Sequence, residues 1–121
     1  MTKIQENPQS GIGPATPVSR IWRMWKKLKA NAFTDRCSIR VFEGHIYSLM
    51  DDEDYYEESG NRKRINSLLY TWDHFRECAL KDEKEESFDW SSRKIKRNDA
   101  DHQRINLLSN ILDGDLRLLI D

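Results

Sequence analysis

Long apolar runs are missing from this chain of 121 residues. No stretch approaches the roughly 20 consecutive apolar residues that a membrane-spanning helix needs. Residues 1–17 contain no apolar segment that could form the core of a secretory signal peptide. We therefore expect a protein without a transmembrane segment, located in the cytoplasm, in the nucleus or in both.

Cysteine is scarce, because the chain contains only Cys37 and Cys78. A disulfide between them is an open alternative, but a reducing compartment favours free thiols. His74 and Cys78 are four residues apart, a spacing that places two zinc ligands on one face of a helix. No C-x-x-C and no H-x-x-x-H accompanies this pair. We therefore expect no metal site and no cofactor.

Catalytic motifs are also missing. The sequence contains no G-x-S-x-G, no H-E-x-x-H, no P-loop and no G-x-G-x-x-G. A Cys–His pair can serve as nucleophile and base, but any chain with two Cys and three His offers such a pair by chance. The sequence therefore predicts a protein that is not an enzyme and has no catalytic residues.

Charge, by contrast, is abundant and unevenly distributed, although the net charge is only -1. The segment 18–34 contains five bases and no acid, whereas 46–61 contains six acids and no base. Separated blocks of charge attract partners or each other, whereas mixed charge mainly confers solubility. This distribution favours a protein that binds something over one that catalyses a reaction.

The beginning of the chain predicts a disordered tail over 1–17, followed by a single domain over 18–121. The tail is rich in Pro and Gly and has little apolar material to bury. Thr16 and Pro17 have the residue types preferred at the N-cap and first position of a helix, so we expect a helix over 18–32. Its bases and its apolar residues occupy opposite halves of the helical wheel.

The next segment, 36–50, predicts a β-hairpin. Residues 37–41 alternate apolar and polar side chains of types that favour strands, and Glu43-Gly44 is a turn signal. A single hairpin is only marginally stable, so it must pack on a helix. The fold class that we predict is α+β, with three helices packed with this short hairpin. The alternative is an all-α bundle in which 45–58 is helical.

A second helix is expected over 61–83, after an acidic loop over 51–60. Six apolar residues share one face of this helix: Ile65, Leu68, Leu69, Trp72, Phe75 and Ala79. Such a continuous apolar face is typical of a helix that packs against a core.

A third helix is expected over 99–112, and it either continues past Gly114 or stops there before an edge strand. Its main apolar stripe consists of Ile105, Leu108 and Leu112, with Leu116 and Leu119 if the helix continues. A second stripe, formed by Leu107, Ile111 and Leu118, lies on nearly the opposite face. A helix that is apolar on two faces is either central in its own fold or in contact with another chain.

These patterns favour an interaction protein, an accessory or regulatory factor that docks a protein partner. The second stripe suggests self-association as a homodimer. The residues expected to bind the partner are Trp22, Trp25, Leu107, Ile111 and Leu118.

The alternative function is nucleic-acid binding, specifically of RNA, through the basic helix over 18–32 and the basic cluster over 93–97. The second cluster also resembles a short nuclear-localisation pattern. A whole-chain isoelectric point near 6.3 argues against strong non-specific binding to nucleic acid. The residues expected to contact phosphates are Arg20, Arg23, Lys26, Lys27, Lys29, Arg93, Lys94, Lys96 and Arg97.

Overall fold

The computed structural model describes residues 17–58 and 60–120. The predicted tail and the predicted Thr16 cap lie outside this part, apart from Pro17, which begins a helix. The long helices of the described part are α1 (Pro17–Ala30), α2 (Arg36–Tyr47), α4 (Asn61–Ala79) and α5 (Asp99–Ile120). Between them lie the short helix α3 (Glu53–Glu57) and two 3₁₀ turns, Ser48–Met50 and Lys81–Lys84.

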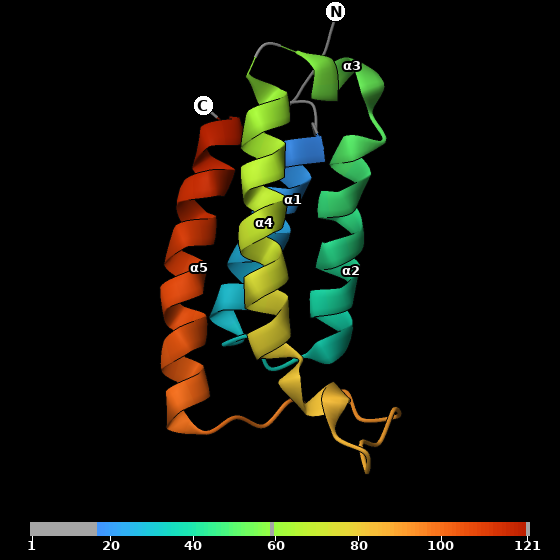
Figure 1. The fold of residues 1–121 in the computed structure, drawn as a ribbon, viewed down its shortest axis with the longest axis vertical. Helices are drawn as coiled ribbons and strands as arrows, with labels where there is room; N and C mark the ends of the chain where they lie inside the picture. The colour runs from blue at the N-terminus through green and yellow to red at the C-terminus, as the bar shows by residue number, and fades with distance from the viewer. Residues whose placement is uncertain (1–16, 59, 121) are drawn as a thin grey trace, which may run out of the picture.

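The long helices run along the length of the molecule and alternate in direction, as Figure 1 shows. In this view α1 lies behind α4, with α2 on one side and α5 on the other. The turn between α1 and α2 and the segment 81–98 are at one end, here called the loop end. The start of α1, the end of α5 and α3 are at the opposite end. This is the up-down-up-down topology of a four-helix bundle.

The predicted β-hairpin over 36–50 is wrong, because this segment forms α2 and the 3₁₀ turn after it. Residues 17–58 and 60–120 contain no strand, only an isolated antiparallel bridge between Asp35 and Lys94. Ile39, Phe42 and Ile46 are fully buried and recur at intervals of three and four residues, which is the helical period. Burial of that face outweighs the local strand preference of the alternating segment. The α+β class therefore gives way to an all-α bundle, closer to the stated alternative.

Five aromatic rings fill the centre of the bundle, and neighbouring ring centroids are 5.0 to 5.9 Å apart. They belong to Trp25, Phe33, Phe42, Trp72 and Phe75, each at most 4% exposed. Because α1, α2, α4 and the α1–α2 turn all contribute rings, one core holds these elements together. The apolar face predicted for the second helix is part of this core.

Helix α5 packs most extensively against α4 and also contacts α1. It runs through Gly114 without interruption. The predicted continuation past Gly114 is therefore confirmed, and the alternative of an edge strand is wrong. Ile105, Leu112 and Leu116 of the main stripe are at most 1% exposed. Leu108 and Leu119 pack against the same core and are partly buried. The main stripe therefore closes the core of the bundle, and the second stripe lies outside this core.

Candidate functional site

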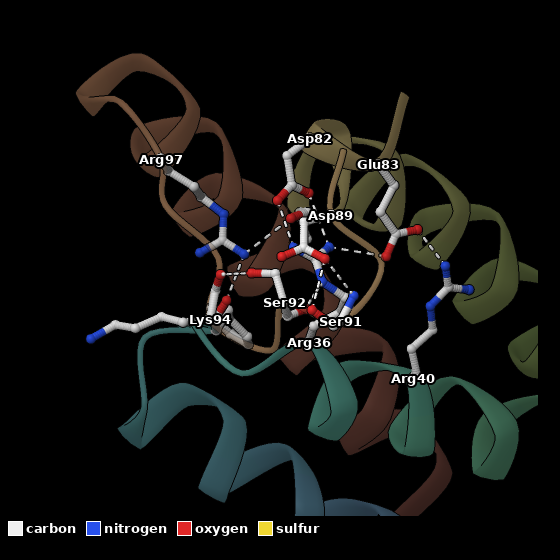
Figure 2. Close-up of polar contacts among 11 residues, drawn as sticks. Arg36, Arg40, Asp82, Glu83, Asp89, Ser91, Ser92, Lys94 and Arg97 are labelled. Carbon is white, nitrogen blue, oxygen red and sulfur yellow. Dashed lines mark hydrogen bonds and ion pairs between the residues drawn. The ribbon is translucent and has the colours of Figure 1, made fainter. Parts of the chain in front are cut away.

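A polar cluster centred on Arg36 holds the loop end, and Figure 2 shows its members. The side chain of Arg36 is only 7% exposed. Its Nη atoms donate to the Asp82 carboxylate at 2.6 and 3.0 Å and to Glu83 at 3.0 Å. Its Nε donates to the Ser92 carbonyl oxygen at 2.9 Å, and Arg40 donates to Glu83 from the outer side. Every buried charge here has an opposite charge or a carbonyl beside it, which indicates a structural role.

Arg97 joins three separate segments at the same end. Its Nη2 donates to the carbonyl oxygens of Phe33 at 2.5 Å and Ala79 at 3.2 Å, and its Nη1 donates to Ala32 at 3.4 Å. Burial lowers the pKa of this guanidinium. Ala32 and Phe33 have φ angles of 53° and 56°, in the left-handed region that side chains rarely adopt. Arg97 therefore secures the strained turn between α1 and α2.

The predicted basic cluster over 93–97 is thus divided by the fold. Arg93 pairs with the Asp35 carboxylate at 3.1 Å, and Arg97 is bound to backbone carbonyls. Hydrogen bonds from Arg93 and Ser38 lower the pKa of Asp35 to about 2. The side chains of Lys94 and Lys96 are exposed. Two of the four cations therefore hold the loop end, and two remain open to solvent.

The two tryptophans predicted to bind a partner face the bundle. Trp25 is 0% exposed, and its Nε1 donates to the carboxylate of Asp113 on α5. Trp22 is partly buried, and the guanidinium carbon of Arg117 lies 5.3 Å from its ring centroid. These contacts attach α1 to α5, so Trp25 belongs to the core and Trp22 is only partly accessible.

The other side of α1 is basic and open. Lys29 pairs with Asp113 at 2.8 Å. Burial opposes ionisation of Asp113, yet hydrogen bonds from Lys29 and Trp25 outweigh it and lower the pKa of this carboxyl. The remaining bases of α1 are exposed and form no ion pair with any residue the structure describes: Arg20, Arg23, Lys26 and Lys27. This face can attract an anionic partner.

The second stripe of α5 is exposed. Leu107 is 67% exposed, Ile111 53% and Leu118 54%. Gly114 lies between the last two on the same side of the helix and is also exposed. We call these four residues the outer face of α5. Their position brings together the three leucine and isoleucine residues that the sequence predicts as partner-binding.

An apolar groove of about 620 Å³ borders the outer face and lies between α4 and α5. Leu107 and Ile111 form one wall together with Leu108, and His74 and Cys78 of α4 form the other. The groove and the outer face share Leu107 and Ile111, so they make one continuous surface along α4 and α5, which are the two most closely packed helices.

Tyr70, which is not among the residues predicted from the sequence, extends this surface on α4. Its ring is 70% exposed and makes an edge contact with His74 at a centroid distance of 4.9 Å. A signal was available, because Tyr70 and His74 are one helical turn apart and lie off the buried arc of α4.

The α4 wall of the groove also carries Glu77, between His74 and Cys78 in the sequence. Cys78 and His74 share its wall, but the described ranges 17–58 and 60–120 contain no group of three or more His, Cys, Asp or Glu placed to hold a metal ion. Both cysteines are free thiols. The arrangement is suited to apolar contact.

No family model, no curated protein and no solved structure matches this chain. Among the described helices, none combines the length and the apolar composition needed to cross a bilayer. The cytoplasmic or nuclear location stays a prediction from the sequence.

Proposed function

We propose that this chain is a non-enzymatic interaction protein that docks a protein partner through the outer face of α5 and the adjoining groove. The observation that carries the proposal is the exposure of Leu107, Ile111 and Leu118, each more than half open to solvent. Contiguous apolar patches on folded proteins mark interaction sites far more often than scattered apolar residues do.

The bundle does not need apolar residues at these positions. The opposite face of α5 already seals the core through Ile105, Leu112 and Leu116. Polar side chains on the outer face would leave that packing unchanged and would make the surface more soluble. The apolar surface is therefore explained best by a partner with a complementary apolar face, such as an amphipathic helix laid along the groove.

A photo-cross-linking residue tests this proposal directly in living cells. It is introduced at Ile111 and, as the matched control, at Val41 of α2, because their exposed fractions are 53% and 52%. We expect discrete protein adducts from position 111 and none from position 41. Equal labelling at both positions, or none at either, would contradict the proposal.

RNA binding is the second candidate function, and the four unpaired bases on α1 favour it. Fewer cations are free to contact phosphates than the sequence suggested, because Lys29, Arg93 and Arg97 are engaged within the fold. Fluorescence anisotropy with a labelled single-stranded RNA at low salt tests it. Binding that falls steeply with salt and is lost when Arg20, Arg23, Lys26 and Lys27 become Gln would support this function. An unchanged anisotropy at low salt removes it.

A further inference from the structure

We propose that the partner seated on the outer face of α5 is a second copy of this chain, with its own α5 antiparallel to the first. This inference rests on the proposed function and identifies the occupant of the same surface. It is carried by the spacing of the outer face, by one glycine, by the charge at its ends and by its area.

The outer face has the same spacing when it is read in either direction. Leu107, Ile111, Gly114 and Leu118 are separated by four, three and four residues, which is the alternation of a coiled-coil seam. In an antiparallel pair related by a two-fold axis, Leu107 meets Leu118 of the second copy. Ile111 then meets Gly114 of the second copy. The surface is therefore complementary to itself, as a symmetric dimer interface requires.

Packing within its own chain does not require glycine at position 114. A Cβ atom added there would have nothing within 4 Å outside its own helix backbone, and its φ is not in the left-handed region. Glycine in a helix interior costs about 1 kcal/mol relative to alanine. A close approach by another backbone or by a large side chain explains a glycine here. In the antiparallel pair that side chain is Ile111 of the second copy.

The ends of the seam are complementary in charge. Arg104 lies one turn before Leu107 on the same side of α5, is exposed and has no ion pair within the described residues. In the antiparallel pair it lies beside the last turn of the second α5. The free carbonyl groups of that turn carry the negative end of the helix dipole.

The area fits a dimer that dissociates on dilution. In this register residues 105–120 of the two copies of α5 overlap, a length of about 24 Å at 1.5 Å per residue. A surface two helices wide, about 20 Å, then gives roughly 480 Å² on each copy. Two such surfaces bury roughly 960 Å², which is in the range of weak or transient complexes.

Sedimentation equilibrium of the purified full chain across the micromolar range tests whether the dimer exists. We expect dimers that dissociate on dilution, and an Ile111→Asp variant whose self-association is at least about tenfold weaker. Val41→Asp, at an equally exposed position on α2, should dimerise like the unaltered chain. A sedimenting monomer throughout that range, or an equal loss in both variants, overturns the proposal.

Gly114→Lys separates association from folding. Lysine is a better helix former than glycine, and its side chain has open space in the single chain. We expect a variant that unfolds at a higher temperature than the original chain, measured under dilute conditions, yet fails to dimerise. Asn106→Lys adds the same charge to a different exposed side of α5 and should leave the dimer intact. A Gly114→Lys variant that dimerises normally contradicts the seam.

Cysteine cross-linking tests the orientation in a background with Cys37→Ser and Cys78→Ala. Leu107→Cys and Leu118→Cys chains should form a disulfide when mixed and oxidised, and neither should cross-link efficiently alone. Efficient cross-linking of each variant with itself indicates a parallel pair and overturns the antiparallel arrangement.

The outcome also distinguishes this inference from the proposed function. If the purified chain is monomeric while the cross-linker at position 111 forms adducts with another protein, self-docking fails and partner docking stands. If neither self-association nor adducts are found, both fail.

Discussion

The loop end of the bundle and the outer face of α5 differ in how completely the chain satisfies its own groups. At the loop end, Arg36 and Arg97 bring charge into partly buried surroundings. Arg36 donates to two carboxylates and a carbonyl oxygen, and Arg97 donates to backbone carbonyl oxygens (Figure 2). On α5, Leu107 and Ile111 remain largely open to solvent. The first region finds most of its partners within the chain, although the buried Nε of Arg97 has none among the described residues. The second region leaves apolar side chains open, and there we propose that a partner docks. This contrast separates residues that maintain the fold from residues available for binding.

Arg36→Ala should have the largest effect of the polar substitutions, because it leaves Asp82 without its buried counter-charge and Glu83 with Arg40 alone. We expect the free energy of unfolding to fall by about 3 kcal/mol, measured by chemical denaturation. Arg62→Ala is the matched control, since the pair between Arg62 and Glu57 is exposed and its loss should leave the denaturation midpoint unchanged. Equal effects of the two substitutions would remove the distinction between buried and exposed pairs.

Arg97→Ala should have the next largest effect. It removes the donor to the carbonyl oxygens of Phe33 and Ala79 and releases the left-handed turn at Ala32 and Phe33. We expect a loss of about 2 kcal/mol in the free energy of unfolding. The neighbouring exposed Lys96→Ala should have no measurable effect in the same denaturation experiment. A stable Arg97→Ala chain would show that the turn holds without the guanidinium.

Ile111→Gln should change the free energy of unfolding by no more than about 0.5 kcal/mol, as expected for a surface position. Thermal unfolding at the lowest workable protein concentration measures this effect without a contribution from association. The neighbouring Leu112→Ala is the contrasting variant, because Leu112 is 0% exposed and its truncation should cost about 3 kcal/mol. Similar losses in both variants would mean that the outer face supports the fold.

The smallest expected effect is on the pH dependence of the stability of the fold, and it arises at the exposed edge of the loop end. Hydrogen bonds from Arg93 and Ser38 lower the pKa of Asp35 from 3.8 to about 2. The ionised carboxylate therefore stabilises the fold fully above pH 3.8, and this contribution is lost as the pH falls towards about 2. Solvent screening of the pair with Arg93 keeps it small. Asp35→Asn should lack this part of the acid transition in a pH titration of thermal stability, and an identical acid transition in both proteins would contradict the assignment.

Sequence periodicity predicted those parts of the fold whose determinants are local. The buried face of α4 and the two stripes of α5 follow from apolar residues three and four positions apart. Residues 37–41 misled the prediction, because Ile39 and Val41 alternate with polar residues and are also good strand formers. The helical spacing of three and four residues, which decides the structure, is seen only when the buried Ile39 is compared with Phe42 and Ile46.

The polar cluster at the loop end was not predictable in the same way. Arg36 and its partner Asp82 are 46 positions apart, and Arg97 and Phe33 are separated by 64. No local pattern relates residues at such distances, so the basic cluster over 93–97 looked like one solvent-exposed unit. The candidate surface on α5 was accessible from the sequence because all its members lie on one helix. The position of Tyr70 off the buried arc of α4 could be read from the sequence, but its place beside the groove depends on how the fold aligns α4 with α5.

The contacts of Arg97 have a consequence for how the chain can be divided. A cut in the exposed segment 85–87 would leave α1 to α4 in one fragment and α5 in the other. The second fragment would still carry Arg97, whose hydrogen bonds to Phe33 and Ala79 lie in the first. The two fragments should therefore reassemble when mixed, because the arginine of the second fragment can restore its hydrogen bonds to the first.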